Sequence, residues 1–143
     1  MNLETFFRET YIDSLEKYAS MGPGRLWSSR PMIVCADDFS FSAQGSYTHY
    51  CNPKMTQEWY ESVELGFPSE VEELLLEYAE EPDTPTDSVY GYVPVDVLQK
   101  VIDKHGGIDV LKTITDEYDG KWMDIRERYI REKNREEKLN DLL

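Results

Sequence analysis

The sequence predicts an α+β fold in which a small antiparallel sheet of three to four strands is packed with four to five helices, the last of them long and charged. The chain has 143 residues, the length of a single domain. Apolar residues make up 40% and aromatic residues 13% of the chain, which is enough to build one hydrophobic core. Segments with the two-residue period of strands stand beside segments with the period of helices, an order typical of α+β proteins.

The first expected element is a helix near the N-terminus. Asn2 is its predicted N-cap, because an amide oxygen there can accept a hydrogen bond from a free backbone N–H group. Gly22-Pro23-Gly24 ends it, since none of these residues continues a helix well. Between them, apolar side chains recur every three or four positions: Leu3, Phe7, Tyr11, Leu15 and Tyr18.

Three strands, and a shorter fourth candidate, are expected in the middle of the chain. The apolar run at residues 31–36 and the alternating run at residues 39–44 predict a hairpin that turns at Asp37-Asp38. Alternation over residues 59–65 predicts a third strand with an acidic outward face. The fourth candidate, at residues 89–93, follows a proline-containing segment that is typical of an exposed loop.

Several helices are expected after the third strand. Ser69 and Glu72 have the spacing of a capping box, and the predicted helix that follows would bury Val71, Leu74, Leu75 and Tyr78. Pro94 suits the first position of the next helix. That helix is predicted to end at Gly106-Gly107, where His105 would interact with the C-terminal helix dipole.

The last third of the chain has helical spacing over residues 108–129. Gly120 either splits this stretch into two helices or only weakens one. From Arg126 onward, charges of both signs alternate. We therefore expect one α+β domain at residues 1–125 and a charged helical extension at residues 126–143. Trp122, Ile125 and Tyr129 continue the apolar stripe into this extension, which predicts a homodimer through the C-terminal helix.

The formal net charge is -14 at pH 7, and it is unevenly distributed. Residues 55–99 contain twelve carboxylates and no Lys or Arg. Such a charge argues against direct binding of nucleic acid or of an anionic membrane surface. No apolar run approaches the roughly 18 residues of a membrane span, and the N-terminus lacks the pattern of a secretory signal. A soluble, cytoplasmic protein is therefore expected.

The acidic stretch has two interpretations. It is either a solvated surface that serves solubility alone, or a surface that presents carboxylates to a basic groove of a nucleic-acid-binding protein. In the second interpretation the partner-binding residues would be Glu70, Glu73, Glu77, Glu80, Glu81, Asp83 and Asp87, with Tyr60 as an aromatic anchor on the open face of the sheet.

The sequence contains weak candidates for other chemistry. Cys35, His49 and Cys51, with Asp37 or Asp38, have zinc-type side chains, but their spacing fits no standard zinc site. The simpler expectation is a buried Cys35, a loop Cys51 and a surface His49, with both thiols free. A Cys51–His49 nucleophile and base lacks any surrounding motif, and no phosphate-binding loop is present. We therefore predict no catalytic residue, no metal and no cofactor.

A small-ligand site is the alternative. Tyr60 and Tyr92 could stack on a nucleotide signal in an oligomer, with Arg25, Arg30 or Lys54 facing its phosphates. A small metal-dependent enzyme is a third, weaker alternative.

Four short segments, in this order, resemble a group of uncharacterised small acidic proteins of tailed phages and prophages. They are DFSFSAQ at residues 38–44, YCNP at 50–53, YESVELGFPS at 60–69 and VYGYVP at 89–94. The resemblance covers about residues 36–108 and brings no activity and no catalytic residue with it. It implies a phage accessory protein of the host cytoplasm, a class that often inhibits host enzymes or defence systems at nucleic-acid-binding sites. The prediction is thus a non-enzymatic, acidic anti-defence inhibitor whose partner is a basic host protein.

Overall fold

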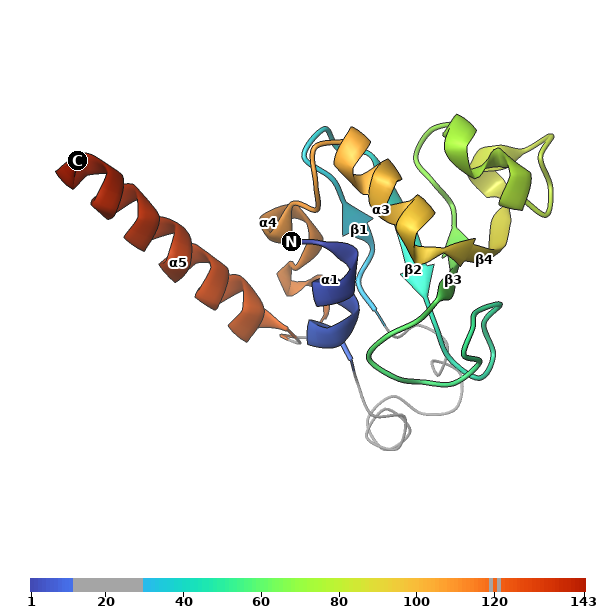
Figure 1. Ribbon diagram of the computed structural model, residues 1–143, viewed down its shortest axis with the longest axis horizontal. Coiled ribbons are helices and arrows are strands. Elements are labelled where there is room, and N and C mark those ends of the chain that lie inside the picture. The colour runs from blue at the N-terminus through green and yellow to red at the C-terminus, as the bar shows by residue number, and fades with distance from the viewer. Residues whose placement is uncertain (12–29, 119, 121) are drawn as a thin grey trace.

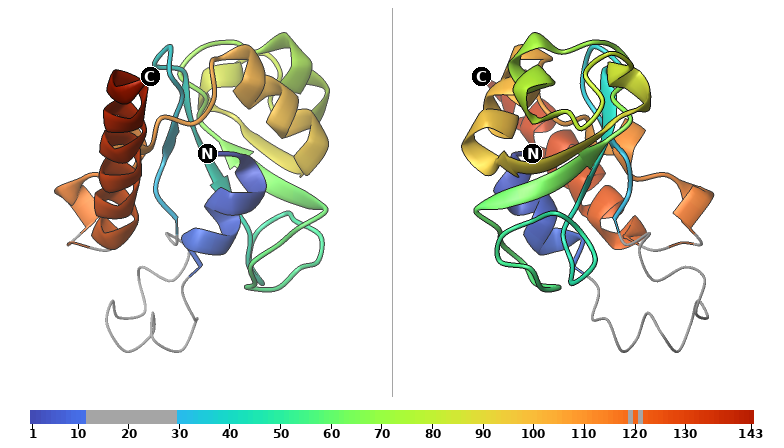
Figure 2. Two further views of the ribbon diagram at one scale, coloured as in Figure 1. Left: turned by 60° about the vertical axis from the view of Figure 1, so that its left-hand side comes forward. Right: turned by 90° about the vertical axis from the view of Figure 1, so that its right-hand side faces the viewer.

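The computed structural model describes residues 1–11, 30–118, 120 and 122–143, and it has the α+β architecture that the sequence predicts (Figure 1). Four strands form one antiparallel sheet in the order β1-β2-β3-β4. Two helices lie against one face of this sheet, and a long C-terminal helix projects from the body (Figure 1, Figure 2).

The sheet consists of β1 (Ile33–Val34), β2 (Ser40–Gln44), β3 (Ser62–Gly66) and β4 (Val89–Pro94). The hairpin of β1 and β2 is confirmed. Asp38 takes a positive φ of 75° at its turn, and the Asp37 side chain accepts a hydrogen bond from the Phe39 N–H. The third strand begins at Ser62 and not near residue 59, so the alternation before Ser62 does not describe strand faces.

Two helices, α1 (Leu3–Glu9) and α3 (Val95–Lys104), pack side by side on the sheet. Asn2 caps α1 as predicted, since its Oδ1 accepts a hydrogen bond from the Thr5 N–H at 2.8 Å. The helix ends at Glu9, earlier than its apolar stripe suggests, with Thr10 as its C-cap; the N–H and the hydroxyl of Thr10 both donate to the Phe6 carbonyl. Leu15, Tyr18 and Gly22-Pro23-Gly24 lie outside the described residues.

The segment after Ser69 is not the amphipathic α-helix that was predicted. It forms the short 3-10 helix η2 (Glu73–Tyr78), in which Leu75 is buried while Val71 and Leu74 are 56% and 47% exposed. Ser69 is not its cap, because its hydroxyl accepts from the Ser40 N–H. Glu72 takes the capping position and is itself buried. A second 3-10 helix, η3 (Pro85–Asp87), lies in the predicted loop.

The C-terminal third contains α4 (Val110–Thr113), η4 (Asp116–Tyr118) and α5 (Met123–Leu142). The stripe over residues 108–129 is therefore divided among three helices, with positive φ angles at Gly120 and Trp122. Ile125 packs on Val110 and Ile114, and this small cluster fixes the first turn of α5 to the body.

One main core lies between the sheet and the helices that cover it. It includes Phe6 and Phe7 of α1, Leu98 and Ile102 of α3, and the inward side chains of the strands. In the part of the chain that the structure describes, no helix has the length and apolarity needed to cross a membrane.

Candidate functional site

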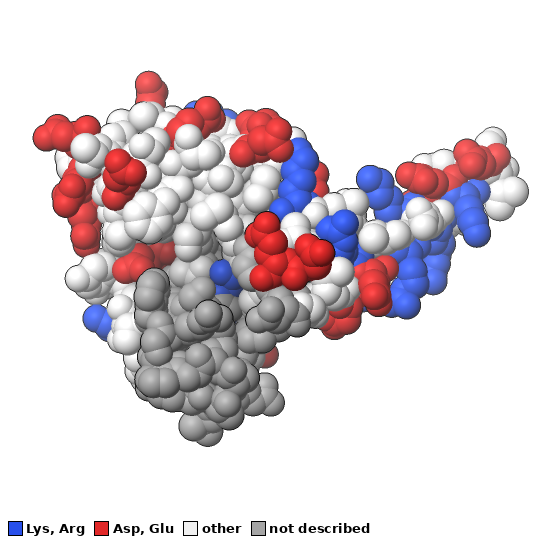
Figure 3. All heavy atoms as spheres, turned by 180° about the vertical axis from the view of Figure 1, so that it is seen from behind, with Lys and Arg blue, Asp and Glu red and all other residues white. Residues whose placement is uncertain are grey.

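The surface carries a group of seven exposed carboxylates, which we call the acidic face. They lie before η2, on η2, in the loop after it and on η3: Glu70, Glu73, Glu77, Glu80, Glu81, Asp83 and Asp87. Acidic side chains gather at the end of the body that holds η2 and η3, whereas basic side chains lie along α5 (Figure 3). The residues predicted from sequence are thus exposed as expected, apart from Tyr60.

Backbone and side-chain hydrogen bonds fix the acidic face to the edge strand β4. The Glu80 N–H donates to the Val89 carbonyl at 2.9 Å, and the Glu81 N–H donates to the Ser88 hydroxyl at 3.0 Å. The Tyr90 hydroxyl donates to the Pro85 carbonyl at 2.6 Å from a fully buried ring. The four carboxylates from Glu80 to Asp87 are therefore presented from a segment that is anchored at β4.

Three large apolar side chains are exposed in the same part of the chain. Phe67, Val71 and Leu74 are 55%, 56% and 47% exposed. Phe67 also has a positive φ of 52°, a conformation that bulky residues rarely adopt. Their exposure makes these three side chains available for contact with another protein.

The prediction that Tyr60 is an exposed anchor is wrong. Tyr60 is only 6% exposed, its hydroxyl donates to the Met55 carbonyl at 2.8 Å, and its ring packs on Phe7. It precedes β3, so the strand alternation that placed it on the open face does not apply. The neighbouring Trp59 is 57% exposed instead.

The predicted pair of Tyr60 and Tyr92 is wrong, because Tyr60 is buried; Tyr92 lies beside Tyr50 instead, and the cations expected around the pair are not assembled there. The rings of Tyr50 and Tyr92 lie 6.0 Å apart and both are exposed. Lys54 reaches the Tyr50 ring at 5.6 Å. Arg25 lies outside the described residues, and Arg30 is buried. The structure therefore gives the nucleotide alternative one cation near the tyrosines among the described residues.

Arg30 is part of the core. Its guanidinium donates to the carbonyls of Phe7 and Gln57 and lies 4.7 Å from the centre of the Phe7 ring. Burial lowers the pKa of this guanidinium, and the Tyr60 ring beside it acts in the opposite direction. This arrangement holds the segments before β1 and β3 against α1.

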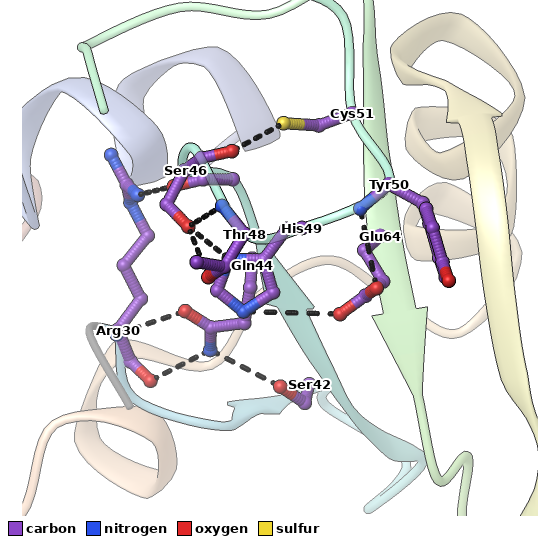
Figure 4. A network of polar contacts seen from close by, with 10 residues as sticks. Arg30, Ser42, Gln44, Ser46, Thr48, His49, Tyr50, Cys51 and Glu64 are labelled. Atoms are coloured by element: carbon purple, nitrogen blue, oxygen red, sulfur yellow. Dashed lines mark hydrogen bonds and ion pairs between the residues drawn. The ribbon is translucent and has the colours of Figure 1, made fainter. Parts of the chain in front are cut away.

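Cys35 is not part of the network that holds the other two proposed zinc ligands (Figure 4). His49 Nδ1 lies 2.6 Å from the Ser46 hydroxyl, and His49 Nε2 lies 3.8 Å from a Glu64 oxygen. Cys51 Sγ donates to the Ser46 carbonyl at 3.3 Å. His49 and Cys51 are both buried, so the expectation of a surface His49 is wrong. No three His, Cys, Asp or Glu residues in the described ranges are placed to hold a metal ion.

Ser46, His49 and Glu64 contain the residue types of a hydrolase triad, but their contacts are those of a turn. The Ser46 hydroxyl also accepts from the Thr48 N–H at 3.1 Å, and the Ser46 carbonyl accepts from the His49 N–H. Burial raises the pKa of the Cys51 thiol and that of the Glu64 carboxyl. A thiol with a raised pKa is a poor nucleophile at neutral pH. The network therefore fixes the loop before β3.

His105 lies between two carboxylates, an arrangement that no local sequence pattern predicts. Its Nδ1 is 2.6 Å from Asp37 and its Nε2 is 2.9 Å from the buried Glu72, whose other oxygen accepts from Lys104 at 2.9 Å. Burial opposes a charge on this ring, but the hydrogen bonds and charges of the two carboxylates outweigh it and raise the pKa of His105. The partners lie 68 and 33 positions away in the sequence, so no local spacing indicates the cluster.

A cavity of about 620 Å³ opens beside the N-terminal ends of α1 and α3, and we call it the α1–α3 groove. Sequence analysis missed it, because its walls come from three separate parts of the chain. They are Asn2, Leu3, Glu4, Phe7, Glu58, Trp59, Tyr60, Val95, Asp96 and Gln99.

Comparison with protein-family models, with curated proteins and with solved structures gave no significant match.

Proposed function

We propose that this chain is a non-enzymatic binding protein whose acidic face occupies a basic surface of a protein partner. The observation that carries the proposal is the acidic face itself: seven exposed carboxylates on η2, η3 and the segments beside them, in a stretch of sequence that contains no Lys or Arg. Charge of one sign on a well-fixed surface favours a partner surface of the opposite sign.

The partner class we propose is a nucleic-acid-binding protein. Its Lys and Arg residues normally neutralise phosphates, and carboxylates at a fixed surface can take up the same side chains. Phe67, Val71 and Leu74 would add apolar contact area to an interaction that charge alone makes fast but weak. In the context implied by the phage resemblance, the partner is a host protein and the complex forms in the host cytoplasm.

The experiment combines affinity purification from host lysate with a charge-reversed variant. We expect the wild-type chain to recover a basic nucleic-acid-binding protein at low salt and to lose it at high salt, because screening weakens exposed charge pairs. The variant Glu73→Lys/Glu77→Lys/Glu80→Lys should fail to recover this partner at either salt concentration. With the purified partner, the wild-type chain should compete with nucleic acid for binding.

The matched control is Glu127→Lys/Glu132→Lys/Glu136→Lys, which makes the same change of charge on α5. We expect this variant to bind as the wild type does. If it loses the partner equally, total charge and not the acidic face drives the interaction. Recovery of no basic nucleic-acid-binding protein at low salt would contradict the proposal.

A further inference from the structure

We propose that the α1–α3 groove binds a small organic cation, meaning an ammonium or guanidinium group carried on an apolar chain or ring. This inference concerns a different surface from the acidic face and does not depend on the proposed partner.

The size and the walls of the groove suit a small molecule. Its volume of about 620 Å³ falls within the roughly 300–1,000 Å³ of small-ligand pockets. Leu3, Phe7, Val95 and the rings of Trp59 and Tyr60 supply apolar surface. Such walls would cover the chain or ring of the ligand.

The charged residues among the described residues that line the groove all have the same sign. Glu4, Glu58 and Asp96 are exposed, and no Lys or Arg is among the described residues that line it. An organic cation is the ligand class that this negative charge attracts.

The backbone N–H groups at the starts of α1 and α3, which could bind an anion, mostly donate to groups of the protein itself. The Leu3 N–H at the start of α1 donates to Gln99 Oε1 at 2.8 Å, and the Gln99 amide donates to Asp103 at 2.9 Å. At the start of α3 the Val95 N–H donates to the Glu61 carbonyl. The Val97 N–H donates to Asp96. The two helix ends therefore leave few N–H groups for a phosphate or carboxylate.

Trp59 gives the groove an aromatic surface for the cation. Its side chain is 57% exposed, while its backbone carbonyl accepts from the Gln57 amide at 2.6 Å, which holds this turn in place. An indole ring is the best aromatic partner for an ammonium or guanidinium group. The adjoining Phe7 and Tyr60 rings already have one cation beside them, since the Arg30 guanidinium lies 4.7 Å and 5.8 Å from their centres.

The test uses three probes that share one apolar body and differ in charge: 4-phenylbutylamine, 4-phenylbutanol and 4-phenylbutyrate. Isothermal titration calorimetry with the full chain should give binding of the amine, with the alcohol about tenfold weaker and the carboxylate weaker still. Trp59→Ala and the double variant Glu58→Gln/Asp96→Asn should each weaken amine binding by about five- to tenfold. Urea unfolding of each variant would show that the fold is retained.

Two control variants separate this inference from the proposed function. Glu127→Gln on α5 and the charge-reversed acidic-face variant should both bind the amine as the wild type does, even if the latter has lost its protein partner. Equal affinity for amine and alcohol would overturn the inference, as would failure to bind the amine at concentrations up to about 10 mM, where weak sites saturate. Much tighter binding of an acetylated arginine peptide would assign the groove to a polypeptide and overturn the small-molecule proposal.

Discussion

At the residue scale, His105 connects three segments that are distant in the sequence. His105 follows α3, Asp37 lies in the β1–β2 turn and Glu72 lies just before η2, yet one imidazole ring contacts both carboxylates. The ring also stacks on Phe39 with the ring centres 4.0 Å apart. Because Glu72 is buried, it needs the partners that His105 and Lys104 provide.

We expect the cluster to make stability depend on pH. The pKa of His105 is raised in the folded protein, so its protonation adds to the free energy of unfolding. This contribution is complete below about pH 6.5 and is lost as the pH rises through the pKa of His105 in the folded protein. The pKa of Asp37 is lowered, mainly by the hydrogen bond from the Phe39 N–H and then by His105. Burial raises the pKa of Glu72, but its bonds to Lys104 and His105 outweigh this and lower it. The contributions of Asp37 and Glu72 to the free energy of unfolding are lost as the pH falls through the pKa values that these carboxyls have in the folded protein.

His105→Asn should therefore lower the free energy of unfolding by about 1–3 kcal/mol near pH 5.5 and by less at pH 9, because the stabilisation from the raised pKa of His105 decreases as the pH rises. Urea unfolding of both proteins at the two pH values measures this difference. Lys112→Gln removes an exposed ion pair with Asp38 in the same turn and serves as the control. Its effect should be the same at both pH values. A His105→Asn effect that does not change with pH would show that the cluster acts by packing alone.

Residue-level prediction from the sequence worked where the local pattern determines the outcome. The cap at Asn2, the turn at Asp37-Asp38 and the end of α3 just before Gly106-Gly107 are all local. The exposure of Trp59 and the burial of Tyr60 depend on where β3 begins, and that start is set by pairing with β2 and β4. Contacts between distant residues, such as those of His105, have no local signal.

Among the elements, η2 differs most from its predicted form. Spacing alone gives it four apolar positions, but only Leu75 is fully buried. Glu72 accounts for the difference. Its side chain is buried in contact with His105 and Lys104, and the segment that follows forms a short 3-10 helix in which Leu75 is the buried residue.

Leu75→Ala should accordingly lower the free energy of unfolding by about 2–5 kcal/mol, the usual cost of a cavity at a buried leucine. Leu74→Ala is the matched control, since the same atoms are removed from a side chain that is 47% exposed. We expect it to change stability by about 0.5 kcal/mol or less. Urea unfolding of the two variants measures the contrast, and similar losses would mean that η2 is an amphipathic helix in solution.

The C-terminal helix was predicted as an element, and α5 confirms it. Its start at Met123 depends on tertiary contacts: Arg126 donates to the carbonyls of Leu111 and Ile114 at 2.6 Å and 2.8 Å. Beyond this first turn the side chains are mostly exposed, including Ile130 and Leu139. The homodimer through α5 stays a prediction, which light scattering at high protein concentration tests.

At the scale of the whole molecule, the fold class and the order of elements followed from periodicity and composition, whereas the α1–α3 groove did not. A groove needs the relative positions of α1, α3 and the segment before β3, and these positions come from packing. The distribution of charge could be predicted from the sequence only in part. The sequence locates the carboxylates, and the structure adds that seven of them are exposed on η2, η3 and the segments beside them.

This distribution should destabilise the free protein at low salt. The carboxylates of the acidic face repel one another over distances comparable to the Debye length, which falls from roughly 30 Å at 0.01 M to about 8 Å at 0.15 M salt. Thermal unfolding should therefore occur about 3–6 °C higher at the second concentration, equivalent to about 1–2 kcal/mol for a domain of this size. Glu73→Gln/Glu77→Gln/Glu80→Gln should raise the low-salt melting temperature and reduce the effect of salt.

The control variant is Glu127→Gln/Glu132→Gln/Glu136→Gln, which neutralises the same number of carboxylates on α5. Residues 121–143 carry seven basic and six acidic residues, so removing three acidic ones relieves little local repulsion. Calorimetry of the three proteins at two salt concentrations distinguishes local from total charge. If both variants respond alike, the destabilisation comes from the net charge of -14 as a whole. If only the acidic-face variant responds, the chain keeps these carboxylates together at a cost in stability, and a basic partner that neutralises them would recover that free energy on binding.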